Sequence, residues 1–500
     1  MFESINFLSD LNISIFHDSK LVYPEEIPFN SSIQYPEYPK LGISKDYNSI
    51  YDAIRTTLVL LGLDKENIGT PKWNPLGEII QPGDKVVIKP NFVLSSHKKG
   101  GDLYSVITHP SIIRPLVDYT YIALKGTGRI IIADAPQMDC NFIELLEKTR
   151  LGSIKEIYKK ELNFDIDIFD LRNFWLDASY DFKGSGSRDR HKLPGDPLGN
   201  TIINLGKESQ FYGLDNQKYY GADYNRNETQ KHHKGKLQEY SISKTILSAD
   251  VVISLPKLKV HKKVGVTLNL KGFVGISTNK NYLVHYKLGS PDEKGDQYPD
   301  GALSPRRRRV IKLQRKTHDI FLSKLNPFTD FLYGLLESSA KIVLIPLLVD
   351  KVTNIDAGDW FGNDSAWRMV ADLTKILIYA DKEGTIQETP VRRLFCLVDG
   401  IIGGENQGPL IPDNKKCGLI VAGFNPLAVD LTCTRLMGFD YKKIKMLSRL
   451  LDNSDQFFVS LSKINIHSNE NLVDLLNFEN KNKYFNFVPP FGWRGYIEIE

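Results

Sequence analysis

Two short apolar runs on either side of a helical stretch most constrain the fold of this chain. "KVVIK" (85–89) follows the turn sequence "QPGD", and "RIIIA" (129–133) follows "GTG". Between them, Pro110 suits the first position of a helix that we expect to continue to about Lys125. Strand, helix and strand within this length are typical of a βαβ unit, which favours a parallel sheet. The sequence therefore predicts an α/β fold.

Three later apolar runs extend the predicted sheet: "VVISL" (251–255), "FCLVD" (395–399) and "CGLIVAG" (417–423). After the last of these, Asn425 and Pro426 are typical of an N-cap and a first helical residue. A chain of 500 residues, 41% of them apolar, can bury more than one core. We predict parallel-sheet, Rossmann-like lobes in a two-lobed molecule with a central cleft.

Composition divides the chain into four parts. They are an N-terminal elaboration (1–80), an α/β lobe (81–280), a helical segment (281–390), and a second α/β part with the C-terminal tail (391–500). The first lobe contains a long polar insertion at 172–245, of the kind that usually forms an active-site lid or is poorly ordered.

Polar side chains follow several of the predicted strands. Lys89 and Asn91 follow one strand, and Asp134 and Asp399 end two others. Ligands of open parallel sheets bind at the carboxyl ends of the strands. We therefore expect these groups to line one cleft for an anionic ligand, and we assign catalytic roles to the two aspartates.

The segment "KLKVHKKVGVTLNLKGFVGIS" (257–277) carries the strongest signal of function. If its start is extended, period-two geometry puts Lys257, Lys259 and His261 on one face. Lys271 is surrounded by small, apolar or amidic residues. Such surroundings lower the pKa of a lysine, as a nucleophilic or cofactor-tethering lysine requires. We predict that His261 and Lys271 are catalytic. Lys262 and Lys263 are expected to be solvated.

His285 is a candidate metal ligand or general base, because imidazole titrates near neutral pH. A divalent metal at this histidine is one option for a cofactor, and the cofactor is otherwise unknown. The complete set of expected substrate-binding or anion-binding residues is Lys89, Asn91, His109, Lys257, Lys259, Asn269, His233, Asn363, Asp364 and Glu405.

Charge and cysteine content narrow the classes of partner. The 64 basic and 60 acidic residues give a net charge of +4, which argues against a nucleic-acid binder. The four cysteines form no CxxC pair, so we expect no iron–sulfur cluster and a reduced, cytoplasmic location. The N-terminus lacks the pattern of a secretory signal. We expect a small-molecule substrate, and a homo-oligomer is an open option.

Residues 305–350 combine a basic run with an apolar one. "PRRRRVIKLQRK" includes Arg306, Arg307, Arg308 and Arg309, and "FTDFLYGLLESSAKIVLIPLLV" follows it. Charges interrupt the apolar part, so a transmembrane helix is not expected. Two interpretations stay open. One is a solvated basic turn before a core helix, and the other is a peripheral contact with the inner face of a membrane.

The segments "VVIKPNFV", "THPSIIRPLVDY", "IIIADAP", "ADVVISLPKLKVHKKVGVTLNLKGFVGI" and "VDGIIGGENQGP" together resemble the domain of unknown function 362 family over about residues 80–440. Relatives with the long insertion and a "WFGND"-like stretch are found among bacterial surface-polysaccharide genes. The order of His261, Lys271 and His285 is also similar to that in nickel-pincer lactate racemases. That resemblance implies an acid–base group, an anchor for cofactor or substrate, and a metal ligand, in that order.

These observations predict an enzyme that acts on an anionic or polyhydroxylated small molecule, such as a sugar or a lipid-linked saccharide. The expected chemistry is acid–base isomerisation or redox chemistry, with or without a metal. The alternative is a non-catalytic, membrane-peripheral binding or scaffolding protein of a polysaccharide assembly system.

Overall fold

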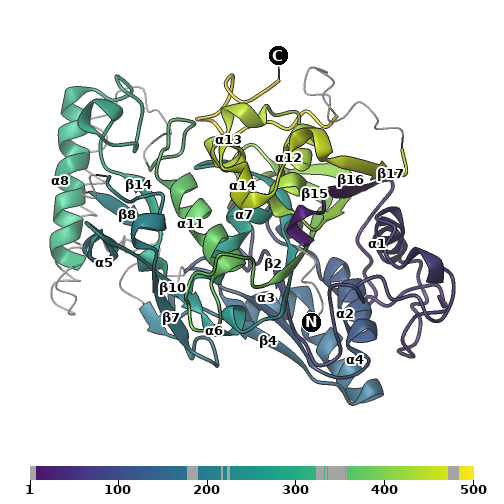
Figure 1. Ribbon diagram of the computed structural model, residues 1–500. Coiled ribbons are helices and arrows are strands. Elements are labelled where there is room, and N and C mark those ends of the chain that lie inside the picture. Colours follow the sequence, from purple (N-terminus) through teal and green to yellow (C-terminus); the bar gives the residue numbers. More distant parts are fainter. Residues whose placement is uncertain are drawn as a thin grey trace.

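The computed structural model describes residues 7–176, 190–214, 218–221, 226–322, 332, 335, 355, 357–470 and 484–499. Its centre is a large, mostly parallel sheet, in the strand order β17-β1-β16-β15-β11-β2-β3-β4 (Figure 1). These strands are β1 (Asn12–His17), β2 (Lys85–Pro90), β3 (Arg129–Asp134), β4 (Ile166–Asp170), β11 (Val251–Leu255), β15 (Arg393–Glu405), β16 (Asp413–Gly423) and β17 (Asn465–Ser468). The prediction of an α/β fold built on a parallel sheet is confirmed.

Five neighbouring strands of this sheet, β15-β11-β2-β3-β4, are parallel, whereas β16 is antiparallel to both of its neighbours. β12 (Lys257–His261) follows β11 directly and pairs in parallel with the second half of β15. It then turns back through β13 (Gly265–Val266). The lysine-rich segment is therefore extended at its start, as its spacing predicts.

Successive side chains of a strand point to opposite faces of the sheet, and in the central strands both sets are apolar. Helices therefore cover both faces. One core contains Val86 and Ile88 of β2 and packs under α1 (Ser49–Leu60), α2 (Pro110–Leu124), α3 (Phe142–Thr149) and α4 (Gly152–Leu162). The other contains Val87 and packs under α7 (Leu268–Gly272), α11 (Ala366–Tyr379), α12 (Pro426–Leu436) and α13 (Lys445–Asp452). The short helix α14 (Ser454–Phe457) follows. The result is a three-layer arrangement.

Cap signals read from the sequence are present in the structure. Asn425 caps α12 by accepting from the backbone N–H groups of Leu427 and Ala428, and Pro426 is the first residue of that helix. His109 caps α2 through Ser111 N–H, with Pro110 at the first position. These local signals fixed the helix starts correctly.

The polar insertion forms small sheets in the parts that the structure describes. β7 (Asn200–Asn204), β10 (Leu237–Ser243) and β9 (His233–Lys234) make one, β8 (Tyr219–Gly221) pairs with β14 (Val284–Lys287), and β5 (Phe174–Leu176) pairs with β6 (Arg190–Lys192). The helices α5 (Arg226–His232) and α6 (Lys244–Leu247) lie beside them. The division of the molecule into two lobes around a cleft stays a prediction.

The four arginines 306–309 belong to a helix. α8 (Pro305–Leu322) stands at the edge of the molecule, on the far left of Figure 1. The interpretation of this basic run as a turn is therefore wrong, because it forms the first turns of α8. The apolar run that follows lies almost wholly outside the described residues. Within the described part of the chain, no helix is long and apolar enough to cross a membrane.

Candidate functional site

A cavity of about 400 Å³ lies at the carboxyl ends of β2, β3 and β12. α7, the turn before β14, and α8 complete its wall. Its position agrees with the general rule for ligand sites in open parallel sheets. The charged and titratable groups that line it include Asp134, Lys259, His261, Lys262, Lys263, Lys271, Lys280, His285 and Arg315. Among the described lining residues, Asp134 is thus the sole carboxylate.

Three buried lysines face this cavity without a carboxylate partner in the described part of the chain. Lys259 Nζ donates to the backbone carbonyl oxygen of Val106, and Lys280 Nζ donates to those of Ala135, at 2.8 Å, and Ser277, at 3.2 Å. Lys271 Nζ makes no hydrogen bond or ion pair with any described residue. Burying unpaired ammonium groups is costly, and a bound anion would offset that cost.

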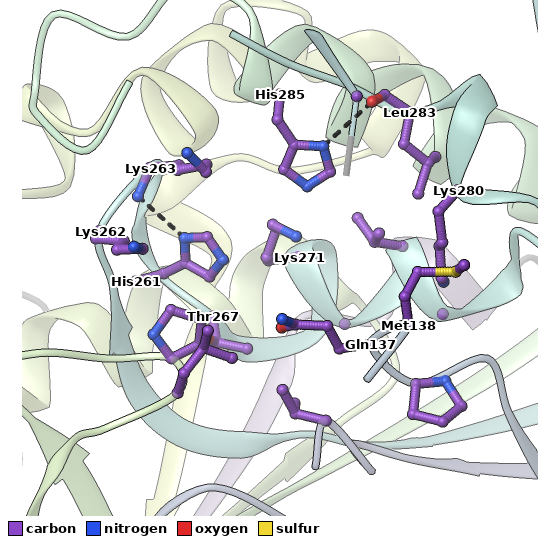
Figure 2. Close-up of a pocket in the computed structure, with 18 of the residues that line it drawn as sticks. Gln137, Met138, His261, Lys262, Lys263, Thr267, Lys271, Lys280, Leu283 and His285 are labelled. Atoms are coloured by element: carbon purple, nitrogen blue, oxygen red, sulfur yellow. Dashed lines mark hydrogen bonds between the residues drawn. The ribbon is translucent and has the colours of Figure 1, made fainter. Parts of the chain in front are cut away.

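Lys271 is held in the cavity by α7. The backbone N–H groups of Asn269 and Leu270, in the first turn of this helix, donate to the Asp430 carboxylate over 3.0 and 2.9 Å. Burial lowers the pKa of Lys271 to about 7, and the charges of Lys263 and Lys89 act in the same direction. Figure 2 shows its side chain between those of the two cavity histidines. A sizeable fraction of this amine is therefore neutral near neutral pH.

The two histidines of the cavity are held in opposite tautomers. The backbone N–H of Lys263 donates to His261 Nδ1 over 3.1 Å, so the proton of the neutral ring is on Nε2. His285 Nδ1 lies 3.2 Å from the carbonyl oxygen of Leu283 and must donate to it, which leaves the lone pair on Nε2. Burial and then the nearby lysines lower the pKa of both rings well below the usual value. The pair offers one donor and one base.

Asp134 lies at the floor of the cavity and is paired with Lys89, which does not line it. Their side chains are 2.8 Å apart and almost fully buried, and the second carboxylate oxygen accepts from Phe92 N–H over 2.9 Å. A Cβ atom at Gly275 would lie 2.0 Å from Asp134 Oδ1, so this close approach requires glycine. The pair is internally satisfied, and Asp134 is poorly placed to bind a further cation.

Two buried polar atoms on the wall are unsatisfied. Asn91 Oδ1 and Thr267 Oγ1 have no hydrogen-bond partner among the residues that the structure describes. Such atoms are rare in folded proteins and are usually satisfied by a ligand or water. An amide oxygen is an acceptor and a hydroxyl is both donor and acceptor. Both atoms suit a hydroxylated ligand.

Several cavity residues have no recognisable signal in the sequence. Lys263, expected in solvent, has a side chain only 13% exposed and bonds to Asp359 over 2.8 Å, with its ammonium above the ring of Tyr286. Lys262 also pairs with Asp359, over 2.9 Å, and is partly exposed. Lys280 and Arg315 reach the cavity from a short turn and from α8, where spacing gives no clue to their direction.

Three of the predicted site residues form a separate buried cluster. Lys257 Nζ lies 3.1 Å from Asp399 and 2.6 Å from the hydroxyl of Tyr23, which itself donates to Asp399 over 2.6 Å. The other Asp399 oxygen accepts from His109 N–H over 3.0 Å, and the His109 ring stacks on Tyr23 at 4.1 Å. None of these residues lines the cavity. The cluster fastens the N-terminal segment to the sheet.

The remaining predicted residues lie in supporting positions. Asn269 bonds to Asp430, and His233 bonds to Gln238 and to the backbone carbonyl of Tyr282. Asn363 donates to the backbone carbonyl oxygens of His285, at 3.0 Å, and Gly358, so it fixes the strand that carries the cavity histidine.

Two acidic residues of the predicted set are remote from the cavity. Asp364 pairs with Arg368 over 2.8 Å beside α11. Glu405 accepts from Val488 N–H and pairs with Lys415 at the end of β15.

The cavity does not suit a metal bound by protein side chains alone. Within the described ranges, no group of three or more His, Cys, Asp or Glu side chains could hold an ion. His285 shares its surroundings with several lysines, and the nearby carboxylate is already paired with Lys89. The donor set therefore fits an anion better than a cation.

Comparison with known proteins gives a match to one family model but no activity. The family model described as "Domain of unknown function (DUF362)" matches residues 201–435. No curated protein matches the sequence. A crystal structure of a Thermotoga maritima protein from a structural genomics consortium is similar over 77% of this chain, at 11% identity and a TM-score of 0.28. The match covers 58% of that protein's chain.

Proposed function

Because residues 201–435 place the chain in the domain of unknown function 362 family, for which the family description gives no activity, we propose a function from the cavity itself. We propose that the protein binds a small hydroxylated anion in this cavity and transfers a proton to and from that ligand. One observation carries the proposal. The buried lysines 259, 271 and 280 face one cavity without a carboxylate partner in the described residues. An anion would supply the missing charge.

The ligand class that fits best is a sugar acid or a sugar phosphate. A volume of about 400 Å³ lies within the range of small-molecule sites. Asn91 Oδ1 accepts from one hydroxyl of the ligand, and Thr267 Oγ1 bonds to a second. The basic side chains hold its carboxylate or phosphate group. This class includes the sugar-derived anions expected for surface-polysaccharide metabolism.

The opposite tautomers of the two histidines support acid–base isomerisation. His285 Nε2 takes a proton from the carbon beside a carbonyl or carboxylate group of the ligand. His261 Nε2–H and the neighbouring ammonium groups stabilise the negative charge that develops on oxygen. His285 then returns the proton to the same carbon or, in a hydroxycarbonyl ligand, to the former carbonyl carbon, while the proton of the neighbouring hydroxyl passes to the former carbonyl oxygen. No electron acceptor is needed for these steps.

Ligand binding is tested by thermal unfolding with gluconate, a hexose phosphate and neutral glucose. We expect both anions to raise Tm and glucose to leave it unchanged, and the shift to be smaller in Lys280→Met. Lys159→Met is the matched control, because that lysine is exposed and remote from the cavity. Equal stabilisation by glucose, or an unchanged shift in Lys280→Met, would contradict an anion site.

Proton transfer is tested by solvent exchange, which does not require the product to be known. Incubation of the bound anion in heavy water should give deuterium at the carbon beside its carbonyl or carboxylate group, measured by nuclear magnetic resonance. We expect His285→Gln to abolish the exchange and to retain the Tm shift. Exchange at the rate of the unaltered protein would exclude His285 as the base.

A second candidate function is contact with a membrane surface. On α8, Leu313 and Ile320 are 64% and 53% exposed, one heptad apart, and Arg306 and Arg309 are exposed on the same face. This mixture supports a peripheral interaction with anionic lipid. Sedimentation with anionic vesicles should fall when the four arginines 306–309 are changed to serine. If vesicle binding is unchanged both by these substitutions and by added salt, an electrostatic contact with the membrane is excluded.

A further inference from the structure

The lysines of the cavity differ in what their nitrogen atoms contact. Lys259 and Lys280 donate to backbone carbonyl oxygens, and Lys263 is paired with Asp359. Lys271 alone among these four has neither an acceptor nor an ion pair in the described part of the chain. Its amine is therefore the one that no protein contact holds in place.

The surroundings of Lys271 exclude bulk water and provide a proton acceptor. The residue is 8% exposed, and it faces the cavity between the two histidines (Figure 2). The lone pair of His285 Nε2 and the N–H of His261 Nε2 belong to the same cavity. A buried amine beside a base is the arrangement used for covalent catalysis by lysine.

The protonation state of the amine supports this reactivity. Burial first, and then the charges of Lys263 and Lys89, lower its pKa to about 7. An ordinary lysine is almost wholly protonated at this pH and is then not a nucleophile. Burial lowers the pKa of Lys280 to about 7 as well, but its nitrogen already donates to two backbone carbonyl oxygens, whereas that of Lys271 has no such contact among the described residues.

We propose that Lys271 forms an imine with a ligand that carries both an anionic group and a carbonyl group, such as a 2-oxo acid or a keto sugar phosphate. This inference rests on the proposed function and narrows its substrate class. A carbonyl compound supplies the acidic C–H bond that isomerisation requires, and an imine makes that bond more acidic.

The covalent step balances without an oxidant or a reductant. The lone pair of the neutral amine forms the C–N bond, and the carbonyl π electrons move to oxygen. His285 Nε2 passes one proton from nitrogen to the alkoxide oxygen, which gives the carbinolamine, and then passes the second nitrogen proton to the carbinolamine hydroxyl. That hydroxyl departs as water and the C=N bond forms. His261 Nε2–H donates a hydrogen bond to the oxygen until it leaves.

The test traps the imine by reduction. The full chain is incubated with pyruvate in one arm and dihydroxyacetone phosphate in the other, sodium borohydride is added, and intact mass and peptide masses are recorded. The two arms distinguish a carboxylate ligand from a phosphate ligand. We expect one reduced adduct for each chain, on Lys271, in at least one arm.

Matched variants make the result specific. Lys271→Arg keeps the charge but cannot form an imine, so the adduct should be lost, and Lys271→Met serves if the arginine variant fails to fold. Lys160→Arg changes an exposed lysine, paired only with Glu161, and should leave trapping unchanged. An adduct on Lys280, or labelling spread over surface lysines, would overturn the inference.

Binding without borohydride separates the two proposals. If pyruvate or the triose phosphate raises Tm but no adduct forms on Lys271, the imine is excluded and the anion site stands. If neither compound shifts Tm nor labels the chain, and the sugar anions also fail to stabilise it, both proposals fail.

Discussion

Lys257 and Lys271 are both buried lysines of one short segment, yet their surroundings are opposite. Lys257 is enclosed by the Asp399 carboxylate and the Tyr23 hydroxyl. Lys271 faces a cavity and contacts no acceptor among the described residues. The first lysine is part of a closed ion-pair cluster that stabilises the fold. The second keeps an unsatisfied group available to a ligand.

The difference shows that burial of a charge does not identify its role. A paired charge that loses its partner is strongly destabilising, whereas an unpaired one can be replaced by an apolar side chain at little cost. Measurements of stability can therefore distinguish the two lysines even before a ligand is known.

The largest effect is expected for Asp399→Ala. The substitution leaves Lys257 buried without its carboxylate and also removes acceptors from Tyr23 and His109 N–H. We expect the free energy of unfolding to fall by about 3–5 kcal/mol, measured with a chemical denaturant. A loss as small as that of an exposed ion pair would mean that the cluster is not a structural element.

A smaller loss is expected for Gly275→Ala. The new Cβ atom would lie 2.0 Å from Asp134 Oδ1 and 2.6 Å from Lys89 Nζ, so the floor of the cavity must shift. We expect a loss of about 1–3 kcal/mol in unfolding free energy, together with weaker binding of anions. Full stability with unchanged binding would show that the Lys89–Asp134 pair does not shape the cavity.

The prediction for Lys271→Met concerns the pH dependence of stability rather than a loss at one pH. The folded pKa of about 7 is below the unfolded value of 10.5, so between these values the folded state binds fewer protons. The stability of the unaltered protein therefore rises with pH across this window and is lowest below it. Relative to Lys271→Met, the gain should reach up to about 1.4 kcal/mol per pH unit. Parallel pH profiles for the two proteins would place Lys271 in solvent.

Local signals were sufficient for most strands of the central sheet and for two of its helices, α2 and α12. The strand predicted at 85–89 is β2, and Asn425 with Pro426 marks the start of α12. The strand β1 was not predicted. Its place depends on pairing with β16 and β17, far along the chain, and no local pattern contains that information.

The candidate site was predictable where one segment determines it. Lys259, His261 and Lys271 come from consecutive elements and all line the cavity. Lys257 is the exception, because its ammonium pairs with Asp399, at a point where the register of β12 against β15 shifts. Lys257 therefore lies opposite Asp399, outside the cavity. Lys280 depends on how its loop folds against Ala135, which spacing cannot show.

The pairing of β1 with β17 has a consequence for the order in which the chain can fold. Asn12 lies beside Asn465 in this ladder, so the edge of the central sheet joins residues about 450 positions apart. Contacts between residues so far apart form late in folding, because the chain between them must be ordered first. During synthesis, β1 has to wait for nearly all of this sequence before β17 can cover its open edge. Until then at least one edge of β1 is open to contact with other chains.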